Sequence, residues 1–250
     1  MRTQIKTAQE IVDMRESGRI LATILAELKV FTKVGITTTD IDREAARLLD
    51  QHKATAAFLN YNGFPASICI SINNEIAHGI PDDRVLEDGD LVHLDFGVTY
   101  HGMITDAGFG FVLGKATEDQ QRLLTGTKQA LDAAIAEVKD GVRLGDIGQA
   151  VEDVCERYNL KLVYELCGHG VGHQVHEEPT IMNYGLRGTG EALKAGMTIA
   201  LEPNVALGSH EMYLADNGWT WMTKDGSQAV QFEHTVLITD DGAEILTSIE

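Results

Sequence analysis

The chain has 250 residues, and 44% of them are hydrophobic, so it can bury a substantial core as one large domain or two small ones. Lysine and arginine number 20 against 38 aspartates and glutamates, which gives a net charge of -18. This acidic balance argues against broad contact with phosphate backbones or anionic membranes, so we expect neither a nucleic acid nor a membrane as partner.

The opening segment, residues 1–20, carries charged side chains throughout and contains no apolar run. It is therefore neither a signal peptide nor a membrane span, and we expect a cytoplasmic protein. Three cysteines, Cys69, Cys155 and Cys167, stand at no zinc-finger or CxxC spacing. An odd number at such positions predicts reduced thiols that pack in the interior rather than bind metal.

Helices are predicted in both halves of the chain. The first starts near Thr7 and shows apolar residues at helical spacing up to Val34-Gly35, and a second follows the capping stretch at 37–40. A helical stretch near 129–138 ends at Asp140-Gly141, and Asp146 opens another helix that runs through Tyr158. Strand candidates, mostly paired as hairpins, lie at 67–73, 90–97, 103–113, 197–206 and 229–238.

The two halves resemble each other at an offset of 106 residues. Gly35-Ile36 then matches Gly141-Val142, and Asp40-Ile41 matches Asp146-Ile147. Few identities support the alignment, so chance similarity of two helix-Gly-helix units stays open beside an internal duplication. With no linker or low-complexity segment, we expect one domain over residues 1–250, with pseudo-symmetric halves of about 1–115 and 116–250. The element order predicts an α+β fold in which helices back a central, largely antiparallel sheet.

Asp95 and Asp106 lie in one predicted hairpin. If its two-residue loop is Tyr100-His101, opposed positions sum to 201, and the two aspartates face each other directly. Like charges so placed are destabilising unless a cation neutralises them, and a shared metal is the simplest remedy. Taken alone, however, two unrelated aspartates at strand ends would give the same spacing.

Residues 167–173 form a segment rich in glycine, Cys-Gly-His-Gly-Val-Gly-His, in which backbone can approach a metal or substrate closely. His169 is the best ligand candidate there, and a loop of surface histidines is the alternative. His176 completes a His-x3-His-x2-His pattern with no glutamate in the zincin position, which disfavours a mononuclear zincin site.

Two glutamates are the remaining candidate metal ligands. Glu202 ends the apolar run 196–201, where an unpaired carboxylate would be costly to bury and a metal would neutralise it. Glu233 alternates onto one strand face with Gln231 and Thr235, so periodicity alone predicts that it is exposed to solvent. His78, before Gly79 in a loop, could equally be an ordinary turn residue.

Four carboxylates and one imidazole form a constellation that suits two adjacent divalent ions rather than one, because its negative charge exceeds what a single ion needs. That chemistry indicates hydrolysis by a metal-activated water. The five residues are Asp95, Asp106, His169, Glu202 and Glu233.

Over essentially its whole length the chain resembles the type I methionine aminopeptidases. Each shared segment is weak alone, but together, in order and at the family's spacing, they are specific. They are Asn62-Gly63-Phe64-Pro65, Cys69-Ile70-Ser71-Ile72-Asn73, His78-Gly79-Ile80-Pro81, Cys167-Gly168-His169-Gly170, His176-Glu177-Glu178-Pro179, Gly196-Met197-Thr198, Glu202-Pro203 and Phe232-Glu233-His234-Thr235.

The resemblance implies the pseudo-twofold pita-bread fold and two divalent ions, cobalt, manganese, iron or zinc, on the five ligands named above. It implies catalytic roles for His78, His176 and Glu202, and a methionine pocket lined by Phe58, Tyr61, Phe64, Cys69, Val175 and Trp219. Phe58 and Val175 depart from the small cysteine and the bulkier aromatic expected there, and Asp95-Phe96-Gly97 is closer to the proline-peptidase branch. The expected partners are nascent chains that begin with methionine, with a transient ribosome contact, and the expected state is a monomer.

Two other functions stay open on the sequence. A Xaa-Pro peptidase shares the fold and ligands, but such families carry a large domain ahead of the catalytic one, whereas the first helix here starts near Thr7. A non-catalytic binding module of the same fold would be expected to lose ligands, and all five are present. Only 25 residues separate His176 from Glu202, which favours type I over type II enzymes, because the latter carry an insertion there.

Overall fold

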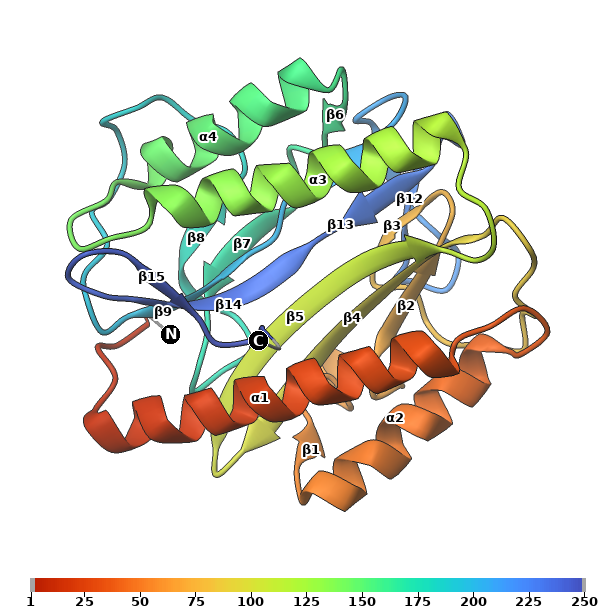
Figure 1. Cartoon of the computed structure of the whole chain (residues 1–250), viewed down its shortest axis with the longest axis horizontal. Helices are drawn as coiled ribbons and strands as arrows, with labels where there is room; N and C mark the ends of the chain where they lie inside the picture. The colour runs from red at the N-terminus through yellow and green to blue at the C-terminus, as the bar shows by residue number, and fades with distance from the viewer. Residues whose placement is uncertain (1–2, 249–250) are drawn as a thin grey trace.

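A nine-stranded antiparallel sheet organises the molecule, which we describe over residues 3–248 in a computed structural model (Figure 1). Its strands run in the order β1-β4-β5-β14-β9-β7-β8, with β2 added to β4 and β15 added to β14. Two three-stranded sheets, β13-β10-β6 and β11-β12-β3, complete the β-structure. The predicted α+β architecture with a central antiparallel sheet is confirmed.

The strands are β1 (Thr55–Ala56), β2 (Cys69–Ile72), β3 (Glu75–Ala77), β4 (Leu91–Tyr100), β5 (Met103–Val112), β6 (Lys161–Leu162), β7 (Cys167–Gly170), β8 (Glu177–Met182), β9 (Thr198–Leu201), β10 (Asn204–Ala206), β11 (Met212–Leu214), β12 (Trp221–Thr223), β13 (Ala229–Gln231), β14 (Glu233–Ile238) and β15 (Ala243–Ile245). The helices are α1 (Ala8–Phe31), α2 (Thr38–His52), α3 (Glu118–Glu137) and α4 (Leu144–Arg157), and Tyr61–Gly63 forms a single 3-10 turn.

The helices pack in pairs against the sheet, α1 with α2 and α3 with α4 (Figure 1). One apolar core joins α1 and α2 to β2 and β4, and a second joins α3 and α4 to β9 and β14. Reciprocal caps set the helix starts: the Thr7 side chain accepts from the Glu10 amide while the Glu10 carboxylate accepts from the Thr7 amide. Helix α3 begins at Glu118, well before the predicted stretch, because Thr117 and Gln120 form the same cap.

A hydrogen bond recurs close to the predicted offset, with donors 106 residues apart and acceptors 107 residues apart. The Gly35 amide donates to the Leu86 carbonyl, as the Gly141 amide does to that of Leu193, both at 2.9 Å. Gly35 and Gly141 both adopt positive φ, 93° and 78°, which glycine alone adopts without strain. The division of the chain into halves at about residue 115 stays a prediction.

The predicted hairpin register is wrong by two residues. The turn is His101-Gly102, both with positive φ, rather than Tyr100-His101, so Tyr100 pairs with Met103 and Gly97 opposes Asp106. A primed turn of this kind matches the twist of the flanking strands. Because the shift is even, both aspartates stay on the same face, as diagonal neighbours instead of directly opposed ones.

Two predicted strands are interrupted at the glutamates of interest. The stretch 197–206 divides at Glu202-Pro203 into β9 of the large sheet and β10 of a small one, and 229–238 divides at Phe232 into β13 and β14. Proline lacks the amide that would continue a ladder, which accounts for the first break. Both glutamates therefore lie where the chain passes between sheets.

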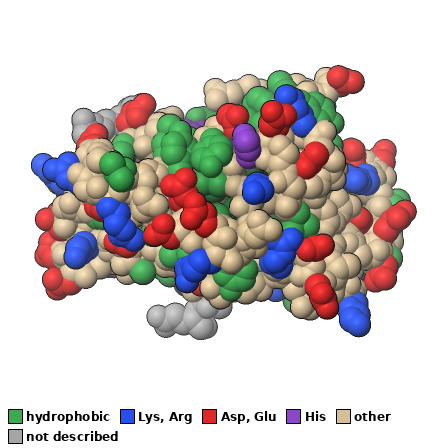
Figure 2. All heavy atoms as spheres, turned by 90° about the horizontal axis from the view of Figure 1, so that it is seen from above, with side chains coloured by type: hydrophobic (Ala, Val, Ile, Leu, Met, Phe, Trp, Pro, Cys, Tyr) green, Lys and Arg blue, Asp and Glu red, His purple; other side chains and the backbone are tan. Residues whose placement is uncertain are grey.

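The surface agrees with the acidic composition. On the face shown in Figure 2, lysine and arginine side chains are scattered among carboxylates rather than gathered into one patch. Of the helices in residues 3–248, none combines the length and apolar character that crossing a membrane demands. Cys69 and Cys155 are buried and Cys167 is half-buried, and all three are free thiols.

Candidate metal centre

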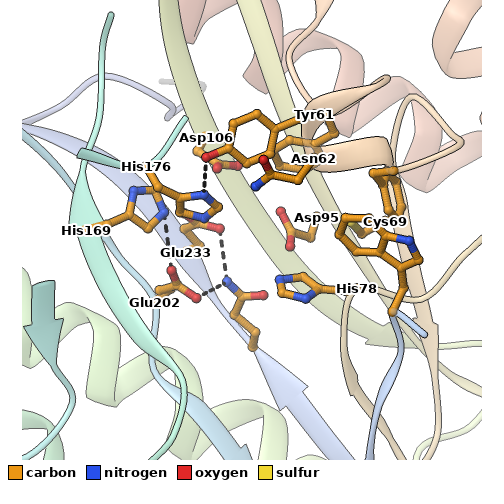
Figure 3. Close-up of a pocket in the computed structure, with 14 residues that line it drawn as sticks. Tyr61, Asn62, Cys69, His78, Asp95, Asp106, His169, His176, Glu202 and Glu233 are labelled. Carbon is orange, nitrogen blue, oxygen red and sulfur yellow. Dashed lines mark hydrogen bonds and ion pairs between the residues drawn. The ribbon is translucent and has the colours of Figure 1, made fainter. Parts of the chain in front are cut away.

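A cavity of about 180 Å³ opens over the middle of the large sheet (Figure 3). One end is polar and the other is lined by aromatic rings. Its lining comprises Phe58, Tyr61, Asn62, Phe64, Cys69, His78, Asp95, Asp106, His169, His176, Glu202, Trp219, Gln231 and Glu233. Every residue that the sequence assigns to the site lies here except Val175.

Neighbouring strands bring the polar end together. Asp95 lies on β4, Asp106 on β5, Glu233 on β14 and His169 on β7, and Glu202 directly follows β9. One ligand atom each from Asp106, His169 and Glu233 lie within 4.8 Å of one another. His169 Nε2 lies 3.4 Å from Glu202 Oε1, which joins Glu202 to the same cluster.

Three of the four carboxylates have an oxygen without the partner that a buried charge requires. Asp95 Oδ1, Asp106 Oδ1 and Glu233 Oε1 are buried without a hydrogen-bond partner among residues 3–248. No lysine or arginine lines the described cavity. Isolated buried carboxylates are costly, so the donor set fits divalent cations, which would neutralise the charge and occupy the orphaned oxygens.

Burial is the main cause of the raised pKa values of these carboxyl groups. It raises the pKa of Asp106 to about 7, and it raises the pKa values of Asp95, Glu202 and Glu233 well above their ordinary range, with neighbouring carboxylates adding to the effect. Without a cation, the cluster therefore retains protons near neutral pH.

The histidines are held neutral by the same burial. It lowers the pKa of His169 to about 3 and that of His78 to about 4, and it lowers the pKa of His176 as well. His169 Nδ1 lies 2.9 Å from the Gly170 carbonyl, which fixes the tautomer that donates there and leaves the Nε2 lone pair facing the cluster. His176 Nδ1 pairs with the Tyr61 hydroxyl at 3.0 Å.

The other end of the cavity is apolar. Phe58, Phe64 and Cys69 are buried in one cluster with Val175, and Trp219 packs its edge against Phe64 at 5.2 Å between ring centroids. Val175 supports this wall from behind rather than lining the cavity.

Gly97 leaves room for the ring of Phe58. A Cβ at Gly97 would lie 2.6 Å from Cε1 of Phe58, so the large ring at position 58 is accommodated because position 97 has no side chain.

The interpretation of strand β14 as solvent-facing is wrong. Gln231 at the end of β13 and Glu233 and Thr235 on β14 are all buried, because the polar side of this segment turns toward the cavity and the centre of the sheet. The Thr235 hydroxyl accepts from the Asp106 amide and donates to its carbonyl, both at 2.8 Å. The alternation of polar residues correctly predicted that these three side chains share one face. It could not tell whether that face lies against solvent or against a buried polar site.

Two lining residues escaped the sequence analysis. Gln231 donates through Nε2 to Glu202 at 2.9 Å and to Glu233 at 3.0 Å, and so ties two carboxylates together. Asn62 adopts φ of 50° in the turn after Tyr61. The sequence signal for Gln231 was its alternation with Glu233 along the strand. For Asn62 the only signal was the Asn-Gly turn that it begins.

Metal-free protein should lose stability as the pH rises from about 4 to about 7. The Asp106 pKa is about 7 in the folded chain against an ordinary 3.8, so the folded state binds more protons than the unfolded one. Such a contribution is complete below the unfolded pKa and disappears as the pH passes the folded pKa. Urea unfolding of chelator-treated protein should show this contribution to the free energy of unfolding falling as the pH rises from about 4 to about 7 and levelling off above that, and added Mn²⁺ should restore stability near neutral pH. A flat or rising profile without metal would contradict the carboxyl cluster as the cause.

Fold and site define a hydrolase-type metal centre, in which buried carboxylates and an imidazole border a small substrate cavity. The model of metallopeptidase family M24 matches residues 12–240. The chain is 41% identical to methionine aminopeptidase 1 of Bacillus subtilis, over 98% of each chain, and 41% identical to the methionine aminopeptidase of Escherichia coli K12, over 99% of this chain and 94% of that one.

Solved structures agree. The methionine aminopeptidase of Rickettsia prowazekii superposes with a TM-score of 0.96 at 38% identity, covering 98% of this chain and 100% of that one. A prolidase from Pyrococcus furiosus, at 24% identity and a TM-score of 0.78, shares the fold, and the match covers only 66% of its length. The protein belongs to metallopeptidase family M24, in its methionine aminopeptidase branch.

Proposed function

We propose that the protein removes the initiator methionine from nascent proteins and peptides whose second residue is small. The observation that carries the proposal is the cavity itself, of about 180 Å³, in which a small apolar compartment adjoins the carboxylate cluster. Such a compartment suits one unbranched, apolar side chain and places the bond that follows it beside the cluster. Phe58, Tyr61, Phe64, Cys69 and Trp219 would contact the methionine side chain, with Val175 behind them.

Two divalent ions, cobalt, manganese, iron or zinc, would be held by Asp95, Asp106, His169, Glu202 and Glu233. Asp95, Asp106 and Glu233 would each offer such ions a buried oxygen without a protein partner. When bound, the pair lowers the pKa of a water molecule toward neutrality and polarises the scissile carbonyl.

The protein's own groups supply the proton transfers and the orientation. Glu202 acts as general base, taking the proton of the attacking water and delivering it to the leaving amine. His78 and His176, neutral because burial lowers their pKa values, donate hydrogen bonds to the oxygen that gains charge. The Tyr61 hydroxyl holds the His176 ring in place.

We further propose a monomer that acts in the cytoplasm on emerging chains, with a transient ribosome contact. The acidic composition supports a protein rather than a nucleic acid substrate.

The test is cleavage of Met-Ala-Ser compared with Ala-Pro-Ala and Gly-Pro peptides, after metal removal and reconstitution. We expect turnover of Met-Ala-Ser alone, abolished by chelation and restored by a divalent ion. Preferential cleavage before proline would identify a Xaa-Pro peptidase instead.

His78→Ala should lower kcat by roughly 10²–10³-fold, as for loss of one donor to a developing oxyanion. His78 is outside the ligand set, so metal content and folding should be unchanged. Steady-state kinetics on Met-Ala-Ser together with metal analysis decide the role. A variant that loses metal would make His78 a ligand, and one with intact turnover would leave it an ordinary loop residue.

A further inference from the structure

A buried ion pair lies beneath the segment that brings His176 into the site. Lys6 precedes α1 and Glu177 begins β8, and both side chains are 0% exposed, with Lys6 Nζ 3.6 Å from Glu177 Oε2. Desolvating two charges largely cancels their attraction, so a buried pair adds little stability compared with apolar side chains of similar size. A role in fixing local geometry accounts for the pair better than stability does.

Glu177 organises the turn that precedes the catalytic histidine. Its Oε1 accepts from the backbone amides of His173, at 2.7 Å, and Gln174, at 3.0 Å. These bonds shape the chain just before His176, whose Nδ1 then meets the Tyr61 hydroxyl at 3.0 Å. The orientation of His176 therefore depends on where the Glu177 carboxylate is held.

Lys6 is itself firmly placed by the body of the protein. Its amide donates to the Gly196 carbonyl at 2.8 Å, and its Nζ donates to Thr3 Oγ1 at 3.1 Å. The Lys6 stem passes directly under the start of the loop, since a Cβ at Gly172 would lie 2.4 Å from Lys6 Cε. Gly172 has φ of 145°, which favours glycine, so backbone and lysine stem fit together here.

We propose that Lys6 and Glu177 form a positioning pair that fixes His176 for catalysis, so that the N-terminal segment is part of the active-site scaffold. The proposal rests on the catalytic role proposed above for His176. Without the ammonium group, Glu177 would keep only His173 Nδ1, at 3.8 Å, as a basic neighbour. The buried carboxylate would then move toward water and take the 173–176 turn with it.

The first test compares Lys6→Met, which keeps the stem and removes the charge, with Lys6→Arg and with Arg15→Met. Arg15 pairs with Glu244 on the surface and is the matched control from the same end of the chain. We expect Lys6→Met to lower kcat for Met-Ala-Ser about tenfold with little change in KM, Lys6→Arg to recover part of the loss, and Arg15→Met to behave as wild type. Unchanged kcat in Lys6→Met with full metal content would overturn the proposal.

A double-mutant cycle separates positioning from general damage. In a His176→Ala background, Lys6→Met should cost no further activity, because the group it positions is already absent. Equal losses in both backgrounds would overturn the proposal. If Lys6→Met fails to fold, Glu177→Gln serves instead, because it keeps an oxygen for both amides. It should lower kcat about threefold in the wild-type background and leave kcat unchanged in the His176→Ala background. The same loss in both backgrounds would overturn the proposal.

A readout independent of the substrate distinguishes this proposal from the proposed function. Amide hydrogen exchange at His173 and Gln174 should accelerate in Lys6→Met and stay unchanged in Arg15→Met. Accelerated exchange in a protein that does not cleave Met-Ala-Ser would reject the substrate assignment while retaining the scaffold. Unchanged exchange in Lys6→Met would reject the scaffold.

Discussion

Glu202→Gln should lower kcat for Met-Ala-Ser by about 10³-fold or more while the protein still binds metal. The amide keeps the shape of the side chain and an oxygen toward the cluster, but it cannot accept a proton at neutral pH. Glu202 is held by Gln231 Nε2 at 2.9 Å and by Asn204 Nδ2 at 3.1 Å, so its carboxylate is oriented before substrate arrives. The loss should therefore fall on proton transfer rather than on substrate binding, with KM little changed.

The control for this variant is metal stoichiometry measured on the same preparation. His169 Nε2 lies 3.4 Å from Glu202 Oε1, so a substitution that disturbed the ligand cluster would also lower metal content. Near-wild-type turnover with both ions bound would refute Glu202 as the general base. Loss of metal together with activity would make Glu202 chiefly a ligand.

The sequence predicted the elements of the fold better than their exact pairing. Apolar periodicity and caps such as Thr37-x-x-Asp40 located three helices closely, since both signals are local. The register of the hairpin was missed because it depends on which residues adopt positive φ, and His101 does so here at 48°. A histidine is a less regular choice for that position than asparagine or aspartate.

The candidate site was predicted where residues could be matched to a family, and less well where physical patterns stood alone. Asp95, Asp106, His169, Glu202 and Glu233 do meet at one cavity. Periodicity misplaced Glu233, because a polar strand face looks the same whether water or a buried ion lies opposite. Lys6 gave no signal at all, since its burial depends on Glu177, which is distant in the chain.

Asp106→Asn should abolish activity and yet stabilise the metal-free protein. Asp106 lies in the cluster, where burial and then repulsion from its carboxylate raise the pKa values of Glu202 and Glu233, and in our proposal it is one of the metal ligands. Asparagine removes that charge and offers an amide N–H₂ that can donate to the remaining carboxylates. At pH 8 we expect roughly 1–2 kcal/mol more stability without metal, and loss of at least one bound ion per chain.

The two effects must be measured together, by urea unfolding in chelator and by elemental analysis after reconstitution. Thr235→Val provides the matched control, because it removes a hydroxyl that contacts only the Asp106 backbone among the cluster residues and leaves every carboxylate in place. It should destabilise the protein with or without metal, and it should retain both ions. If Asp106→Asn instead lowered the metal-free stability while keeping both ions and turnover, two conclusions would follow. The carboxylates would not be held together at a cost in stability, and Asp106 would not be an essential metal ligand. A substitution that raises the stability of the metal-free protein while it abolishes activity indicates a site in which buried charge is retained because it binds metal.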